Sequence, residues 1–270
     1  MRRTRLLVPA LVLASSGALA AHDLFLKLSE YFVRPDAPVR ITALNGTFTT
    51  SENAIARARV ADLSLAGPGG RQPVDTARLA AEGTRTAIRT RTGSAGTYVL
   101  GLSLRPSEIT LKGEQFNEYL REEGLLTTLA ARRAAGELAR PSTERYAKHV
   151  KVIFQAGAAH SESYATVFGY PVEVVPLTNP YELKAGDTLS LRLLKNGAPA
   201  AGIAALAGGR NTAGSAIPTA ALLADHDGVV RVWLRAPGTW YVKFISMTRV
   251  SEPKLDYISQ WATLTFAVRR

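Results

Sequence analysis

Hydrophobic and polar residues alternate in the N-terminal part of the chain. Between residues 22 and 105, apolar positions recur at every second residue in short runs, and the runs stop at turn residues such as Asn45 and Gly46 or the glycine-rich stretch 67–70. Period-two alternation bounded by such residues is typical of β-strands with one buried face. The predicted strands in this part are 23–28, 39–44, 58–65, 85–90 and 97–104.

The spacing changes between residues 109 and 157. Apolar residues from Phe116 to Leu129 recur at intervals of three and four, which indicates helix interrupted at Gly124. A further helix is predicted after Pro141, and it would carry His149 and its neighbours up to residue 153. This part is therefore interpreted as a helical insert.

Strand-like alternation returns after Gly169. Leu189, Leu191 and Leu193 alternate with polar residues, and the Asn-Gly pair at 196–197 and the stretch 225–228 predict hairpin turns. The two β regions also resemble each other, because a glycine turn leads into Gly-Thr-Tyr-Val at 96–99 and into Gly-Thr-Trp-Tyr-Val at 238–242.

These patterns predict a mainly β fold of two tandem immunoglobulin-like or transthyretin-like antiparallel β-sandwiches. The expected N-terminal sandwich covers residues 21–108, the helical insert covers residues 109–157, and the C-terminal sandwich covers residues 158–270.

The first 20 residues have the features of a secretory signal peptide. Three arginines precede a short apolar run at 6–15, and Ala18 and Ala20 form a cleavage site of the A-x-A type. We therefore expect a periplasmic protein that is secreted through a cleavable signal peptide. No later stretch has about 18 consecutive apolar residues, so no transmembrane span is expected in the mature chain.

The composition narrows the chemistry that this chain can perform. Among 270 residues there is no Cys, which excludes disulfides, thiolate metal sites and cysteine nucleophiles. Removing residues 1–20 leaves 30 basic and 22 acidic residues, a net charge of +8. A basic exported protein can meet anionic lipid, polysaccharide or an acidic partner, and nucleic acid is not expected there.

The most unusual placement is that of His22. Cleavage after Ala20 leaves the amine of Ala21 free with His22 in second position, and cleavage after Ala21 leaves His22 first. Either product can chelate a metal through the amine and the imidazole, and the second-position form, with its backbone nitrogen, suits nickel(II) or copper(II). The alternative is that His22 only caps the first strand.

Further ligands for such a site must come from elsewhere in the chain. His226 is the candidate that we include, although it lies in a predicted turn where Asp225 and Asp227 are ordinary turn residues. His160 is expected in a loop, and His149 is expected as a packed or surface helix residue.

Enzyme motifs give no support for catalysis. The sequence contains no Gly-x-Ser-x-Gly elbow, no phosphate-binding glycine loop and no His-Glu-x-x-His helix. We therefore expect a protein that is not an enzyme, and copper-dependent oxidation at the N-terminal histidine is a distant third hypothesis.

Several stretches resemble a family of exported bacterial domains of unknown function (DUF4198), many of which are labelled as nickel-uptake associated. The similar stretches are 21–26, 116–125, 144–148, 169–176, 183–189, 225–228, 237–240 and 261–266. The resemblance implies a periplasmic accessory protein that binds nickel or cobalt for uptake, with His22 and the preceding amine as ligands, and copper as a less favoured metal.

The same resemblance implies a membrane metal transporter or an outer-membrane receptor as partner. The stretch 243–247 contains no histidine, although some relatives are richer in histidine near the final sandwich. The alternative hypothesis is a non-catalytic β-sandwich interaction module that binds an envelope protein or a glycan.

Overall fold

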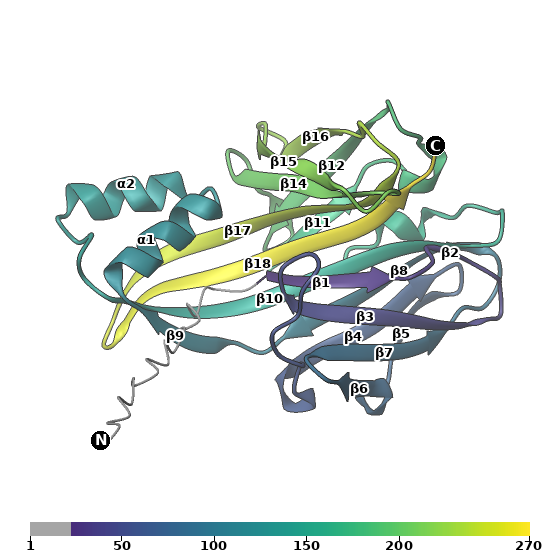
Figure 1. The fold of residues 1–270 in the computed structure, drawn as a ribbon, viewed down its shortest axis with the longest axis horizontal. Helices are drawn as coiled ribbons and strands as arrows, with labels where there is room; N and C mark the ends of the chain where they lie inside the picture. Colours follow the sequence, from purple (N-terminus) through teal and green to yellow (C-terminus); the bar gives the residue numbers. More distant parts are fainter. Residues whose placement is uncertain (1–22) are drawn as a thin grey trace, which may run out of the picture.

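The computed structural model describes residues 23–270, which fold into a mainly β structure of three sheets and two α-helices (Figure 1). The predicted signal peptide, Ala21 and His22 lie outside these residues. Within the described range, no helix has the length and the apolar character needed to cross a membrane.

The first sheet is antiparallel and contains four strands in the order β1, β3, β7, β6. Its strands are β1 (Asp23–Leu28), β3 (Pro38–Gly46), β7 (Arg85–Arg91) and β6 (Leu79–Glu82). The alternation that predicts these strands sets their orientation: Val39, Ile41 and Ala43 of β3 are buried, and the intervening Arg40 is exposed.

A ten-stranded sheet runs through the middle of the molecule in the order β15, β14, β17, β18, β10, β8, β4, β5, and the short strands β2 and β9 also pair with β10. Its long strands are β10 (Ser142–Ala156), β17 (Gly238–Glu252) and β18 (Leu255–Val268). The others are β2 (Phe32–Val33), β4 (Val60–Gly67), β5 (Gly70–Pro73), β8 (Gly96–Leu104), β9 (Ser107–Leu111), β14 (Ala204–Asn211) and β15 (Ala216–Leu223). The parallel pairing of β10 with β18 joins the early strands to the late ones.

The third sheet has four antiparallel strands in which β12 pairs with each of the others. These strands are β11 (Val172–Pro176), β12 (Thr188–Lys195), β13 (Ala198–Pro199) and β16 (Val229–Trp233).

Two large hydrophobic clusters use opposite faces of the central sheet. One combines Leu26 and Ile41 of the first sheet with Val152 of β10, and the other combines Leu191 of the third sheet with Ile153 of β10. Successive side chains of a strand point to opposite faces, so β10 is buried on both sides.

The two helices pack on the outer end of the β17–β18 hairpin (Figure 1). They are α1 (Gly113–Glu122) and α2 (Leu126–Ala134). Phe116 and Leu120 of α1 are buried with Trp261 of β18, and the rings of Tyr119 and Trp261 stack with centroids 5.6 Å apart.

The predicted helix after Pro141 is wrong, because residues 142–156 form β10. Its apolar positions have helix-like spacing only because both faces of the strand are buried, so that period-two alternation disappears. His149 accordingly lies on a central strand and not on a helix, and the polar side chains of Lys148 and Lys151 are buried as well.

Candidate functional site

The first described residue, Asp23, begins β1 at the point where the chain leaves His22. It pairs with Gly46 of β3, and β1 lies against β10 and β18 of the central sheet. The residues around Asp23 therefore surround the position at which the predicted metal-binding N-terminus enters the fold.

A lysine and two carboxylates meet at this position. Lys243 of β17 donates through Nζ to Asp23 and to Glu123, the C-cap residue that follows α1. Its Nζ lies 2.7 Å from Glu123 Oε2. The side chains of Lys243, Asp23 and Glu123 are only 9%, 14% and 12% exposed. We call these three residues the acid pair and its lysine.

One carboxylate oxygen of the acid pair has no hydrogen-bond partner among the described residues. Asp23 Oδ1 is buried and has no hydrogen-bond partner among the described residues, whereas Oδ2 is bonded to Lys243. Burying an oxygen without a hydrogen-bond partner costs folding free energy. Such an oxygen is suited to bind a cation or to accept a hydrogen bond from a ligand.

Burial and the neighbouring charges shift the pKa values of Glu123 and Lys243. Burial, followed by the charge of Asp23, raises the pKa of Glu123 to about 7, although Lys243 opposes this change. Burial alone would lower the pKa of Lys243, but the two carboxylates outweigh it and raise that pKa. The lysine therefore stays charged at neutral pH, while Glu123 exchanges its proton near neutrality.

A second cation, Lys148 of β10, lies close to the acid pair. Its Nζ donates to Asn45 Oδ1 at 2.9 Å and lies 5.4 Å from the centre of the Tyr146 ring. Burial lowers the pKa of Lys148 to about 8, against the effect of Asp23. Lys148, Asn45 and Tyr146 line a cavity of about 240 Å³, together with Arg59.

A buried glutamate extends this polar region under α1. Tyr119 donates to Glu144 Oε1 at 3.2 Å, Ser259 also donates to Glu144, and Trp261 Nε1 donates to Ser259 Oγ at 2.9 Å. Burial raises the pKa of Glu144, and its Oε2 has no hydrogen-bond partner among the described residues.

Two of the four histidines have partners that limit their use as ligands. Both ring nitrogens of His149 are engaged, Nδ1 at 2.9 Å from Ser103 Oγ and Nε2 at 2.7 Å from Gln260 Oε1, and burial lowers its pKa. The Nδ1 atom of His160 lies 3.1 Å from Glu182 Oε1 near the surface.

The structure places His226 in the turn between β15 and β16, where its side chain is 88% exposed and its Nε2 lies 3.1 Å from Asp227 Oδ2. Asp225, His226 and Asp227 are the only set of three or more metal-ligating side chains within residues 23–270 whose donor atoms come within 4.8 Å of one another.

The carboxylate of Asp225 is already committed in this turn. It accepts hydrogen bonds from the backbone N–H groups of Asp227 and Val229 and pairs with Arg231. Turn formation therefore explains the acidic residues, and the described contacts bring His226 to Asp227 and not to Asp23.

Sequence reasoning missed the acid pair and its lysine. Lys243 stands in a buried apolar run between Val242 and Phe244, and a lysine at a core position of a strand requires a buried partner. That signal flags the lysine, but its partners lie 120 and 220 residues away along the chain.

Comparison with solved structures finds matches of low sequence identity, and three of them follow. The trypsin-activated alpha-2-macroglobulin of Escherichia coli has 11% identity and a TM-score of 0.22 over 91% of this chain and 15% of that one. A tetra-tandem repeat from the extending region of a large adhesion protein has 12% identity and a TM-score of 0.22 over 91% of this chain and 49% of that one. A segment of two fibronectin type-III domains from chicken tenascin has 11% identity and a TM-score of 0.19 over 87% of this chain and 95% of that one.

The chain thus spans a small part of the first of these structures and about half of the second. Among curated proteins, none matches this sequence. A family model described as a domain of unknown function, DUF4198, matches residues 19–248.

Proposed function

Since this chain belongs to the DUF4198 family of domains of unknown function, we propose that it is a periplasmic accessory protein that binds nickel or cobalt for uptake. In this proposal residues 1–20 are a cleavable signal peptide, and the new amine of Ala21 and the imidazole of His22 are the nitrogen ligands. The metal is cargo for a membrane metal transporter or an outer-membrane receptor.

The observation that supports this proposal most is the unpartnered oxygen of Asp23. This carboxylate directly follows His22 in the chain, it is buried, and its Oδ1 has no hydrogen-bond partner among residues 23–270. His22 and Asp23 are consecutive residues, so a divalent cation bound by His22 would be held next to the residue that carries this oxygen. Glu123 adds a second carboxylate at the same place.

The donor set suits the proposed metals. An amine, an imidazole and carboxylate oxygens are the borderline and hard ligands that nickel(II) and cobalt(II) accept, and the chain has no thiolate that would favour softer ions. Copper is the less favoured metal, because the family resemblance implies nickel or cobalt. We propose no catalytic role for these residues.

Nickel titration by calorimetry of correctly processed protein tests the proposal. His22→Ala should lose most of the affinity, and one extra residue before Ala21 should weaken binding, because the chelate uses the free amine. His226→Ala should keep most of the affinity, because that side chain contacts Asp227 in an exposed turn. Unchanged nickel affinity in His22→Ala would defeat the assignment.

A second candidate is a non-catalytic interaction module that binds an envelope protein or a glycan. It is favoured by two large, exposed apolar side chains: Leu223, which is 72% exposed and ends β15 beside the turn that carries His226, and Trp233, which is 62% exposed at the other end of β16. Under this candidate the His22→Ala variant retains full function, whereas Trp233→Ala loses binding to the envelope component.

We also propose that the fold is a tandem of two related sandwiches. Each large hydrophobic cluster combines residues of the central sheet with residues of one outer sheet. The two repeated glycine turns lead into matching hydrogen bonds, since Tyr98 donates to the carbonyl of Ser94 and Trp240 to that of Ala236, each four residues back. Equivalent anchors at equivalent strands are what duplication of one β module would leave.

A further inference from the structure

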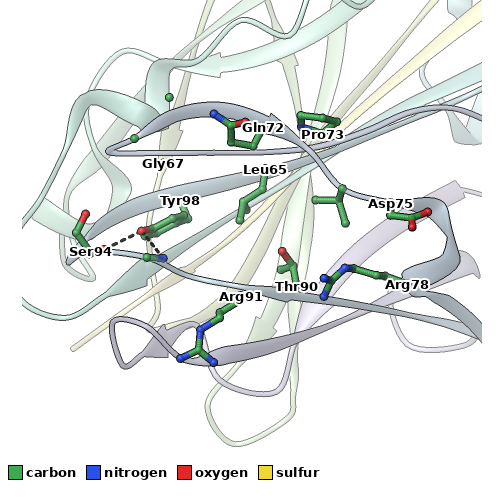
Figure 2. Close-up of a pocket in the computed structure, with 14 residues that line it drawn as sticks. Leu65, Gly67, Gln72, Pro73, Asp75, Arg78, Thr90, Arg91, Ser94 and Tyr98 are labelled. Carbon is green, nitrogen blue, oxygen red and sulfur yellow. Dashed lines mark hydrogen bonds between the residues drawn. The ribbon is translucent and has the colours of Figure 1, made fainter.

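A cavity of about 500 Å³ lies between the β4–β5 hairpin and the turn that joins β7 to β8 (Figure 2). Its volume is in the range of pockets that hold small molecules, which is roughly 300–1,000 Å³. Its lining residues are distinct from the acid pair and its lysine, and its lining includes Arg78 and Arg91.

The floor of the cavity is rigid. Tyr98 and Leu65 are buried, and Tyr98 accepts a hydrogen bond from the backbone N–H of Gly93 at 3.0 Å and donates to the carbonyl of Ser94 at 2.7 Å. These two bonds fix the β7–β8 turn against the ring. The hairpin closes over the same ring, because a Cβ atom at Gly67 would lie 2.3 Å from Tyr98 Cε1.

The charges on the wall are unbalanced. Asp75 is the acidic residue of the lining, and its Oδ1 accepts a hydrogen bond from the backbone N–H of Ala77. Among the described residues, no carboxylate pairs with Arg78 or Arg91, and the nearby Glu82 is occupied by Arg40 and Arg89.

The guanidinium of Arg78 differs from that of Arg91 in having no hydrogen-bond partner within residues 23–270. The Arg91 guanidinium donates to the carbonyl of Asp36, whereas in Figure 2 the Arg78 side chain extends in the direction of Thr90. Thr90 is buried and brings a hydroxyl to the lining, and Gln72 brings an amide. A guanidinium without a protein partner beside neutral donors is suited to an oxyanion.

We propose that this cavity is a binding site for a small organic anion, with Arg78 contacting its carboxylate or phosphate group. The neutral hydroxyl and amide groups contact the remainder of the molecule, and the Tyr98 and Leu65 side chains form the floor. The site is independent of the metal proposal and uses none of its residues.

Calorimetric titration at low salt with three probes of one scaffold tests this proposal: glucuronate, glucose 6-phosphate and uncharged glucose. At least one of the anions should bind and glucose should not. Arg78→Gln should weaken anion binding by about tenfold or more, which is the loss of one charge-assisted contact. Binding of either anion supports the site, and the preferred one identifies the charged group.

Arg89→Gln is the matched control, because it removes the same charge from β7, the strand that carries the lining residues Thr90 and Arg91, at a position outside the cavity lining. It should leave the affinity within about twofold, which is the change expected from an exposed charge that does not line the cavity and is screened by solvent. The Arg78 side chain is exposed and makes no hydrogen bond within residues 23–270, so Arg78→Gln should leave the melting temperature unchanged. The proposal is overturned if neither anion binds at about 10 mM, a concentration that detects even weak sites. Equal binding of glucose, or equal losses in the two variants, would overturn it as well.

Discussion

Replacing Lys243 by methionine removes the ion-pair partner that Asp23 and Glu123 share and leaves two carboxylates facing each other in a largely buried position. Methionine keeps the length and the apolar stem of the side chain, so packing against β18 is retained. The perturbation therefore isolates the charge of the lysine.

The expected cost follows from the burial of the three groups. Removing one partner of a buried ion pair typically destabilises a protein by about 3–5 kcal/mol, because the remaining charge is uncompensated. The pKa of Glu123 gives a similar scale, since its rise from 4.5 to about 7 corresponds to about 3 kcal/mol of unfavourable charging even with the lysine present. We expect a loss of about 3–5 kcal/mol in the free energy of unfolding at pH 8.

This loss should depend on pH in a defined direction. A carboxyl group whose pKa is raised on folding contributes stability that is complete below its unfolded value, here 4.5, and is lost as pH rises through its folded value, here about 7. Lys243 lowers the pKa of Glu123, so the variant has a still higher folded pKa. The deficit should therefore be clearly smaller at pH 5, where Glu123 is protonated, than at pH 8.

Urea unfolding followed by tryptophan fluorescence, in the presence of a chelator, measures this free energy at both pH values. Lys195→Met is the control, because Lys195 is exposed on β12 and its loss should change stability by less than about 0.5 kcal/mol. A Lys243→Met deficit below about 1 kcal/mol at pH 8, within the range of exposed ion pairs, would refute the reasoning. So would a deficit that is the same at pH 5.

Two further substitutions test the packing around the sites. Arg132→Met should lower the free energy of unfolding in urea by at least about 2 kcal/mol. Arg132 is 1% exposed, and its guanidinium donates to two side chains and two backbone carbonyls. Arg133 is exposed, so Arg133→Met should leave this free energy unchanged. Equal effects of the two would contradict the assignment. Gly67→Ala should lower the melting temperature by several degrees, because the added Cβ would collide with the Tyr98 ring. A Cβ at Gly69 would have no heavy atom within 4 Å, so Gly69→Ala should leave the melting temperature unchanged. A larger loss in Gly69→Ala than in Gly67→Ala would contradict this packing.

Local patterns predict much of this fold. The strand expected at 23–28 coincides with β1, and the tight turn at residues 196–197 joins β12 to β13 with both residues at positive φ. The helix expected from Phe116 corresponds to α1 and α2, because one face of each packs on a sheet and keeps the helical period.

The hydrophobic pattern does not predict a strand where both of its faces are buried, because the alternation of apolar and polar residues is then lost. Residues 142–156 belong to a strand whose neighbours β8 and β18 lie on either side, and sheets cover both of its faces. Local patterns also do not predict contacts between residues far apart in the sequence. Asp23, Glu123 and Lys243 lie on or next to three different elements, which only folding brings together. The sequence pattern singles out His22, but no local pattern indicates that Asp23 meets Glu123 and Lys243.

X-ray absorption spectroscopy of the nickel-loaded, correctly processed protein shows whether the imidazole of His22 binds the metal. We predict a coordination shell of nitrogen and oxygen with imidazole scattering, and that imidazole signal should disappear in His22→Ala. A spectrum without imidazole scattering, or one that is unchanged in His22→Ala, would contradict it.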